Sequence, residues 1–155
     1  MKLGDVLRIE RERKKFDAER VSAEMGMTVG EYMELESGSS QIEDWGPKLA
    51  EIAISLATPT SRLISQTGKA SNARQETGQC GNLIKAHRES HGLSREELAN
   101  KLSWPVDEIV SIEEGNSPLE SLAPLLLRYA EIVEQPIFNL FYPCGLPFQS
   151  LESYP

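Results

Sequence analysis

Hydrophobic residues recur along the chain at spacings of three and four positions, which is the period of an amphipathic α-helix. Val106, Ile109 and Ile112 give the clearest example. The strict alternation of β-branched and polar residues that is typical of half-buried strands is absent from the sequence. The pattern therefore predicts an all-α protein built from short helices.

Turn and capping residues set the limits of these helices in the second half of the chain. A first helix starts near Leu83 and ends near Gly92, and a second opens at Ser94, with Glu97 completing a capping box, and runs to Leu102. The remaining helices are expected at residues 105–115, 119–133 and 136–141.

The first half carries equivalent capping residues. Asp17 is placed to cap its second helix, Thr28 with Glu31 forms a capping box for the third, and Gly38 ends that third helix. Each half is therefore expected to contain five short helices.

The two halves are related by an internal repeat. A shift of 77 positions superposes residues 3–64 on residues 80–141 without a gap and gives about 15 identities. The matched pairs include Gly4 and Gly81, Arg11 and Arg88, Glu36 and Glu113, Gly38 and Gly115, Pro47 and Pro124, and Pro59 and Pro136. Glycines, prolines and apolar positions recur together, as expected when two copies need the same turns and the same buried face.

The repeat predicts the domain organisation of the chain. A first domain covers residues 1–64 and a second covers residues 80–141. Residues 65–79 are rich in Ser, Thr, Gly, Asn and Gln and are expected to form a flexible linker. Residues 142–155 contain three prolines, which forbid a regular helix and predict an extended, docked or frayed tail.

Specific motifs carry a family resemblance. The second copy contains LSREELANKL, IVSIEEG, a following Pro-Leu-Glu stretch and a terminal Leu-Phe, and it resembles the lambda-repressor-like (Xre family) helix-turn-helix domain. The first copy resembles this domain more weakly, through FDAERVSAEM, YMELESG and LATPTSRLI. The resemblance implies two tandem five-helix modules, each of which places its third helix in the major groove of DNA.

The family pattern also assigns candidate DNA-binding residues. Arg95 opens the second helix of the second copy, where it could anchor a phosphate, whereas Ala18 at the equivalent position of the first copy could not. The other candidates, on or beside the third helices, are Thr28, Val29, Gly30 and Glu34 in the first copy and Pro105, Val106, Asp107, Ser111 and Asn116 in the second.

The chemistry of the third-helix positions is unusual for base recognition. Major-groove contacts favour Arg, Lys, Asn and Gln, and none of these occurs in residues 28–34 or 105–111. The carboxylates of Glu34 and Asp107 would also stand close to phosphates. The chain carries 16 basic and 24 acidic side chains, a net charge of -8, which repels polyanions unless positive charge gathers locally.

Two groups of basic residues have structural interpretations. By resemblance, Arg11 with Glu36 and Arg88 with Glu113 form buried pairs that tie the first helix of each copy to the end of the third. A second group, within 13 residues of the first copy, alternates with acidic residues and is interpreted as a solvated mixed-charge face. This group consists of Arg8, Arg11, Arg13, Lys14, Lys15 and Arg20.

Other chemistry is weakly indicated. Cys80, His87 and His91 fall at helical spacing and Cys144 follows the last helix, but ordinary surface histidines and free thiols are the favoured interpretation, and no metal or cofactor is expected. No catalytic motif is found, so an enzyme is not expected. The sequence shows neither an apolar run long enough to span a bilayer nor a leader pattern. The spacing of its two cysteines is not that of a disulfide framework. A cytoplasmic location is therefore expected.

Two functions remain open at this stage. The favoured one is a transcriptional regulator that binds double-stranded DNA through two helix-turn-helix units acting as a dimer within one chain. The alternative is a module that kept the helical fold and lost DNA recognition. Such a module would bind a protein, or associate with itself, through acidic third-helix faces or apolar fifth-helix surfaces.

Overall fold

The computed structural model describes residues 1–70 and 76–146, and within these ranges every regular element is a helix. The all-α prediction is therefore confirmed. The elements are α1 (Leu3–Arg13), α2 (Ala18–Met25), α3 (Val29–Glu36), α4 (Ile42–Ser55), the 3₁₀ segment η1 (Thr60–Leu63), α5 (Gln79–Ser90), α6 (Arg95–Leu102), α7 (Val106–Glu113), α8 (Leu119–Ile132), and the 3₁₀ segments η2 (Ile137–Leu140) and η3 (Tyr142–Cys144).

The predicted capping residues start the predicted helices. Asp17 accepts a hydrogen bond from the backbone of Arg20 at the start of α2. Capping boxes open α3, through Thr28 with Glu31, and α6, through Ser94 with Glu97. These local interactions satisfy N–H groups that have no partner within the helix, which is why the sequence locates these helices accurately.

The structure differs from the expected elements at the start of α5 and in the type of the fifth helices. Helix α5 begins at Gln79, four positions before Leu83, because Gly78 supplies the left-handed turn that precedes it. The expected fifth helices are short 3₁₀ segments, η1 and η2, each preceded by a proline.

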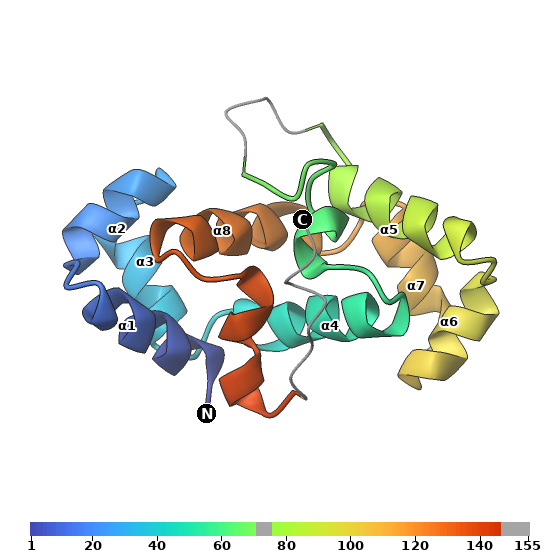
Figure 1. The fold of residues 1–155 in the computed structure, drawn as a ribbon, viewed down its shortest axis with the longest axis horizontal. Coiled ribbons are helices and arrows are strands. Elements are labelled where there is room, and N and C mark those ends of the chain that lie inside the picture. The colour runs from blue at the N-terminus through green and yellow to red at the C-terminus, as the bar shows by residue number, and fades with distance from the viewer. Residues whose placement is uncertain (71–75, 147–155) are drawn as a thin grey trace.

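Helices α1–α3, which we call the first helical group, and α5–α7, the second helical group, lie at opposite ends of the molecule (Figure 1). Helices α4 and α8 pack together between them. In Figure 1, α1 and α5 occupy diagonally opposite positions, and so do α2 and α6. A half-turn about the viewing direction therefore relates the two groups, as expected for a sequence repeat.

Each C-terminal helix packs on both repeats: α8 contacts α5 of its own repeat, and α4 contacts α1 of its own. We call their additional packing on the other repeat the exchange of helices. Helix α8 of the second repeat packs on α2 of the first, and α4 of the first packs on α6 of the second. Likewise, η1 packs on α5 and η2 packs on α1. The expected architecture of two separate five-helix domains is not confirmed, because each helical group packs against helices of both repeats.

The described parts of the predicted linker are held by hydrogen bonds on both sides. The backbone N–H of Ala70 donates to Glu131 on α8, at 2.8 Å, and the side chain of Gln79 donates to the carbonyl oxygen of Ile64, at 3.0 Å. The expectation of a flexible tether at residues 71–75, and of a tail beyond residue 146, lies outside the described residues.

Close packing explains why Gly4 and Gly81 recur in the repeat. A Cβ atom on Gly4 would lie 2.6 Å from the carbonyl oxygen of Leu35, and one on Gly81 would lie 2.3 Å from that of Ile112. Such distances are shorter than van der Waals contact, so the first helix of each repeat can approach the end of the third helix only at glycine.

Candidate interaction surface

Helix α3 buries one side in the core and exposes the other. Tyr32, Leu35 and Glu36 face the core, which turns Val29 and Met33 outward with 38% and 43% of their surfaces exposed. Gly30 and Glu34 are exposed on the same helix, and Thr28 is exposed at its N-cap. This side of α3 therefore presents apolar surface bordered by a carboxylate.

Helix α7 has a similar surface, on which the apolar side chains are less exposed. Ile109, Ile112 and Glu113 are buried, whereas Asp107 is exposed. The candidates Val106 and Ser111 are half-buried, as is Val110, while Pro105 at the N-cap and Asn116 beyond the helix are exposed. The third helices of both repeats thus combine apolar and acidic side chains, and we call their exposed sides the third-helix faces.

Arg95, the expected phosphate anchor, makes a hydrogen bond to a buried carboxylate. Its Nε atom lies 3.0 Å from Oε1 of Glu113, and 32% of the Arg95 side chain is exposed. Glu113 also receives two hydrogen bonds from Arg88 and is fully buried. The guanidinium of Arg95 therefore compensates a buried carboxylate, a role that the sequence alone did not indicate.

The two repeated arginine–glutamate pairs are confirmed as structural. Arg11 donates from Nε and Nη2 to both carboxylate oxygens of Glu36, at 3.0 Å each, and Arg88 makes the same two-pronged contact with Glu113. These hydrogen bonds raise the pKa of both arginines. Both pairs join the first helix of a repeat to the end of its third helix.

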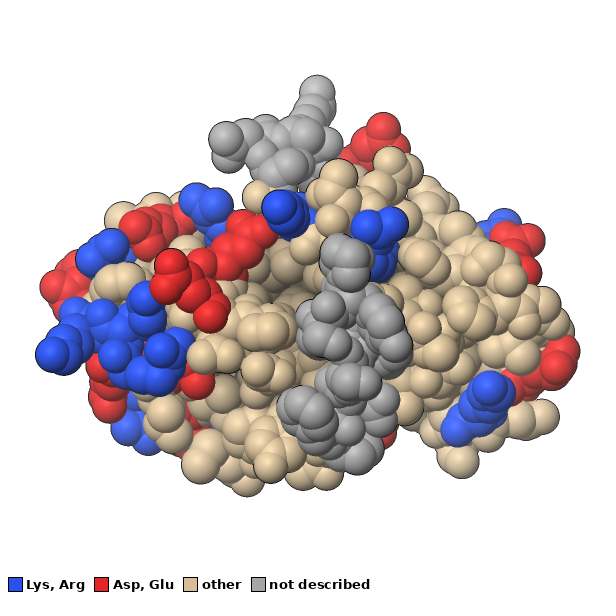
Figure 2. Space-filling view, in the orientation of Figure 1, with Lys and Arg blue, Asp and Glu red and all other residues tan. Residues whose placement is uncertain are grey.

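The basic residues of α1 and α2 form the mixed-charge face that the sequence predicted. Figure 2 shows basic and acidic side chains intermixed over the end of the molecule formed by these helices. Arg8 pairs with Asp5 and Glu12, and Arg13 pairs with Glu10. Further along, Arg20 pairs with Glu24 and Lys14 pairs with Glu134. Most of this positive charge is therefore compensated locally.

Carboxylates also occupy the helix N-termini, where a phosphate would bind. Glu31 accepts from the backbone N–H of its own cap residue Thr28, and this hydrogen bond lowers the pKa of Glu31. Glu97 does the same at Ser94, where Glu96 stands in the same first turn of α6. Acidic groups already complement the positive ends of these helices, which opposes the approach of another anion.

A contact between the repeats covers one flank of α7. Nζ of Lys48, on α4, lies 2.8 Å from Glu108 and over the ring of Trp45 at 4.3 Å. It also lies 5.8 Å from the centre of the Trp104 ring. Both tryptophans are partly buried and pack against the core. The role of Lys48 was not predictable from the sequence, because nothing in the local pattern links α4 to the other repeat.

The expected surface of the fifth helices is buried within the chain. Ile137, Phe138 and Leu140 of η2 are at most 2% exposed, and Leu63 of η1 is fully buried. Because η1 and η2 pack on each other, the apolar groups proposed for association with a partner join the two repeats instead.

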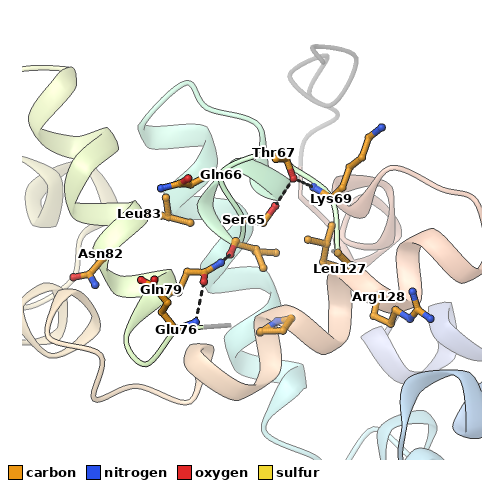
Figure 3. Close-up of a pocket in the computed structure, with 13 residues that line it drawn as sticks. Ser65, Gln66, Thr67, Lys69, Glu76, Gln79, Asn82, Leu83, Leu127 and Arg128 are labelled. Atoms are coloured by element: carbon orange, nitrogen blue, oxygen red, sulfur yellow. Dashed lines mark hydrogen bonds between the residues drawn. The ribbon is translucent and has the colours of Figure 1, made fainter. Parts of the chain in front are cut away.

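A cavity of about 460 Å³ lies between residues 64–70, α5 and α8 (Figure 3). Leu83 and Leu127 supply apolar walls, and Gln79 also lines the cavity. The charged ends of Lys69 and Arg128 point away from Gln79 in this view. The labelled residues thus bring no charged groups together inside the cavity.

The weak metal hypothesis gains no support. Within residues 1–70 and 76–146, no three His, Cys, Asp or Glu side chains are grouped so that they could hold a metal ion. Cys80 is fully buried, which raises the pKa of its thiol. None of the described helices is long and apolar enough to cross a membrane.

Comparison with known proteins adds no assignment. No family model matches the chain, and neither the curated proteins nor the solved structures include a significant match.

Proposed function

We propose that the two repeats are paired helix-turn-helix units and that the protein acts as a protein-interaction module. Its third-helix faces bind a partner segment in which basic side chains flank apolar ones. The observation that carries this proposal is the chemistry of these faces. Val29 and Met33 are exposed beside Glu34, and α7 presents Val106 beside Asp107.

Charge complementarity selects the partner. The repeats carry 8 basic and 12 acidic residues (residues 3–64), and 5 basic and 10 acidic residues (residues 80–141), so both are acidic. Complementary charge speeds encounter and excludes wrong partners, while apolar side chains at the centre of a contact provide most of the affinity. Val29 and Met33 are four positions apart on one helix, so a single partner segment can cover both.

DNA binding remains a second candidate, because the paired arrangement favours it. Helices α4 and α8 hold the two helical groups at a fixed separation, as dimeric helix-turn-helix proteins do on two half-sites about 34 Å apart. The candidate contacts would then be Thr28, Val29, Gly30 and Glu34 from one unit and Val106, Asp107, Ser111 and Asn116 from the other. Arg95 would join them through the guanidinium nitrogens that do not bond Glu113.

A double charge variant and a single-site control distinguish protein binding from DNA binding. Val29→Lys with Met33→Lys adds positive charge to α3, and Ile9→Lys is the matched control on α1, where Ile9 is 41% exposed. Partners captured from cells by the wild type are identified by quantitative mass spectrometry. The purified partner is then titrated against each variant.

The protein-interaction proposal predicts that the double variant loses at least about tenfold in affinity for the partner and that the Ile9 control does not. It also predicts no sequence-selective retardation of random duplex DNA by the wild type at low salt. Selective retardation that the double variant alters would instead establish DNA binding. A partner that binds both variants equally would place the interaction elsewhere.

A further inference from the structure

The exchange of helices creates two contacts between the repeats, which we call the α8 contact and the α4 contact. In the α8 contact, α8 of the second repeat lies against the first helical group. In the α4 contact, α4 of the first repeat lies against the second helical group. The sequence repeat makes the two contacts comparable position by position, because a shift of 77 residues relates them.

The α8 contact is polar and aromatic. The Tyr129 ring stacks on that of Tyr32, with centroids 6.4 Å apart, and the Tyr129 hydroxyl donates to the carbonyl oxygen of Leu7. At the end of α8, Arg13 donates to the carbonyl oxygen of Val133, at 2.8 Å. Lys14 and Glu134 form an ion pair beside it, in which Lys14 lowers the pKa of Glu134.

The equivalent residues of the α4 contact have different chemistry. The 77-residue shift relates Tyr32 to Ile109 and Tyr129 to Ile52. It also relates Lys14 to His91 and Glu134 to Ala57. A first repeat paired with another first repeat would therefore set Tyr32 against Ile52 and Lys14 against Ala57, and it would lose both the aromatic stacking and the ion pair.

The α4 contact carries its own pairing. Lys48 joins Glu108 and lies over Trp45. The same shift relates Lys48 to Leu125, so a second repeat paired with another second repeat would set Glu108 against Leu125. The shift also relates Glu108 to Glu31, so two first repeats would keep a carboxylate opposite Lys48. The α8 contact is thus complete only when a first repeat meets a second repeat, and the α4 ion pair is lost when two second repeats meet.

We propose that the two repeats form a hetero-specific interface, so that the first repeat selects the second repeat of this chain over another copy of itself. Specificity of this kind arises when the wrong pairing leaves polar or charged groups without partners. Half-buried Lys14 and Glu108 would be such groups. The partner that this surface fits is the other repeat, and the chain closes on itself.

The test uses the full chain with a specific protease site inserted between Asn72 and Ala73. The folded protein is cleaved and diluted to nanomolar concentration, and its mass is measured by native mass spectrometry. The cleaved protein is also denatured, refolded and measured again, so that every pairing of the two halves is possible.

We expect the cleaved halves to remain one complex that contains one of each. After refolding, mixed pairs should exceed pairs of identical halves by more than about tenfold. Separation of the halves into monomers on dilution would overturn the proposal. So would refolding into a random mixture, in which about half of the pairs are mixed.

A double variant tests the origin of the selectivity. Tyr32→Ile with Tyr129→Ile gives the α8 contact the residues of the α4 contact and should lower the excess of mixed pairs. Ile9→Val, at an exposed position of α1, is the control and should leave it unchanged. The uncut forms are melted first to separate a folding defect from altered pairing. An unchanged excess in a folded double variant would contradict the role of the two tyrosines.

Discussion

The hydroxyl of Tyr129 donates a hydrogen bond to the carbonyl oxygen of Leu7, although the two residues are 122 positions apart and belong to different repeats. Tyr129 is only 1% exposed, and burial raises the pKa of its phenol. A core aromatic residue of one repeat therefore stabilises the first helix of the other.

Tyr129→Phe should lower the free energy of unfolding by about 1 kcal/mol, because it removes one buried hydrogen bond and keeps the ring. The region of the protein that loses stability is a more specific test than the size of the loss. Amide hydrogen exchange should become faster in α1, in the other repeat, and this is checked by exchange followed with mass spectrometry. A change confined to residues 79–146 would show that the bond does not stabilise α1.

Gly81→Ala should destabilise the protein by about 1–3 kcal/mol, because the new Cβ would lie 2.3 Å from the carbonyl oxygen of Ile112 and force α5 away from α7. Gly30→Ala is the matched control, since the nearest side-chain atom to its Cβ is Thr28 Oγ1 at 3.9 Å. This control should be neutral or stabilising by up to about 1 kcal/mol, as expected of alanine within a helix. Urea denaturation measures both, and similar effects would contradict the close approach.

Glu113→Gln should cost about 3–5 kcal/mol, because it removes the carboxylate that compensates Arg88 and Arg95. Glu114→Gln, one position further on, changes an exposed side chain and should stay within about 0.5 kcal/mol of the wild type. Denaturation midpoints distinguish the two. If both variants proved equally mild, Glu113 would not be the centre of a buried charge network.

Stability should fall as the pH decreases from 7.5 to 5. Burial lowers the pKa of His87, and His91 and Arg62 on η1 lower it further. A histidine with a depressed pKa in the folded state takes up its proton first in the unfolded state. The free energy of unfolding is therefore fully present above the ordinary pKa, near 6.5, and decreases as the pH falls through this value toward the folded pKa.

His87→Gln should flatten this pH dependence, and Arg62→Gln should reduce it in part by removing one of the charges that oppose protonation. Thermal melting at several pH values provides the measurement. An identical pH slope in the wild type and His87→Gln would exclude this histidine as the cause.

Local sequence information predicted the helices well and their packing poorly. Asp17, Thr28 and Ser94 act within four residues of their own positions, so each could be assigned from spacing alone. The paired charges Arg11 with Glu36 were found through the repeat and the resemblance. The exchange of α4 and α8 was missed, because an apolar helix face does not specify which repeat it packs against.

The candidate site was only partly predictable for the same reason. The family resemblance placed Val29, Glu34 and Asp107 on the outer sides of the third helices, and all three are exposed. The engagement of Arg95 depends on Glu113, 18 positions away, which already holds Arg88. Nothing in the spacing indicated that one buried carboxylate would accept two arginines.

The shared core is tested most directly by nuclear Overhauser effects from the ring protons of Tyr129. The structure predicts effects to the ring of Tyr32 and to the side chain of Leu7, both in the first repeat. Two repeats that each closed on themselves would place Tyr129 against Ile109 instead. Effects to Ile109 without effects to Tyr32 would contradict the exchanged arrangement.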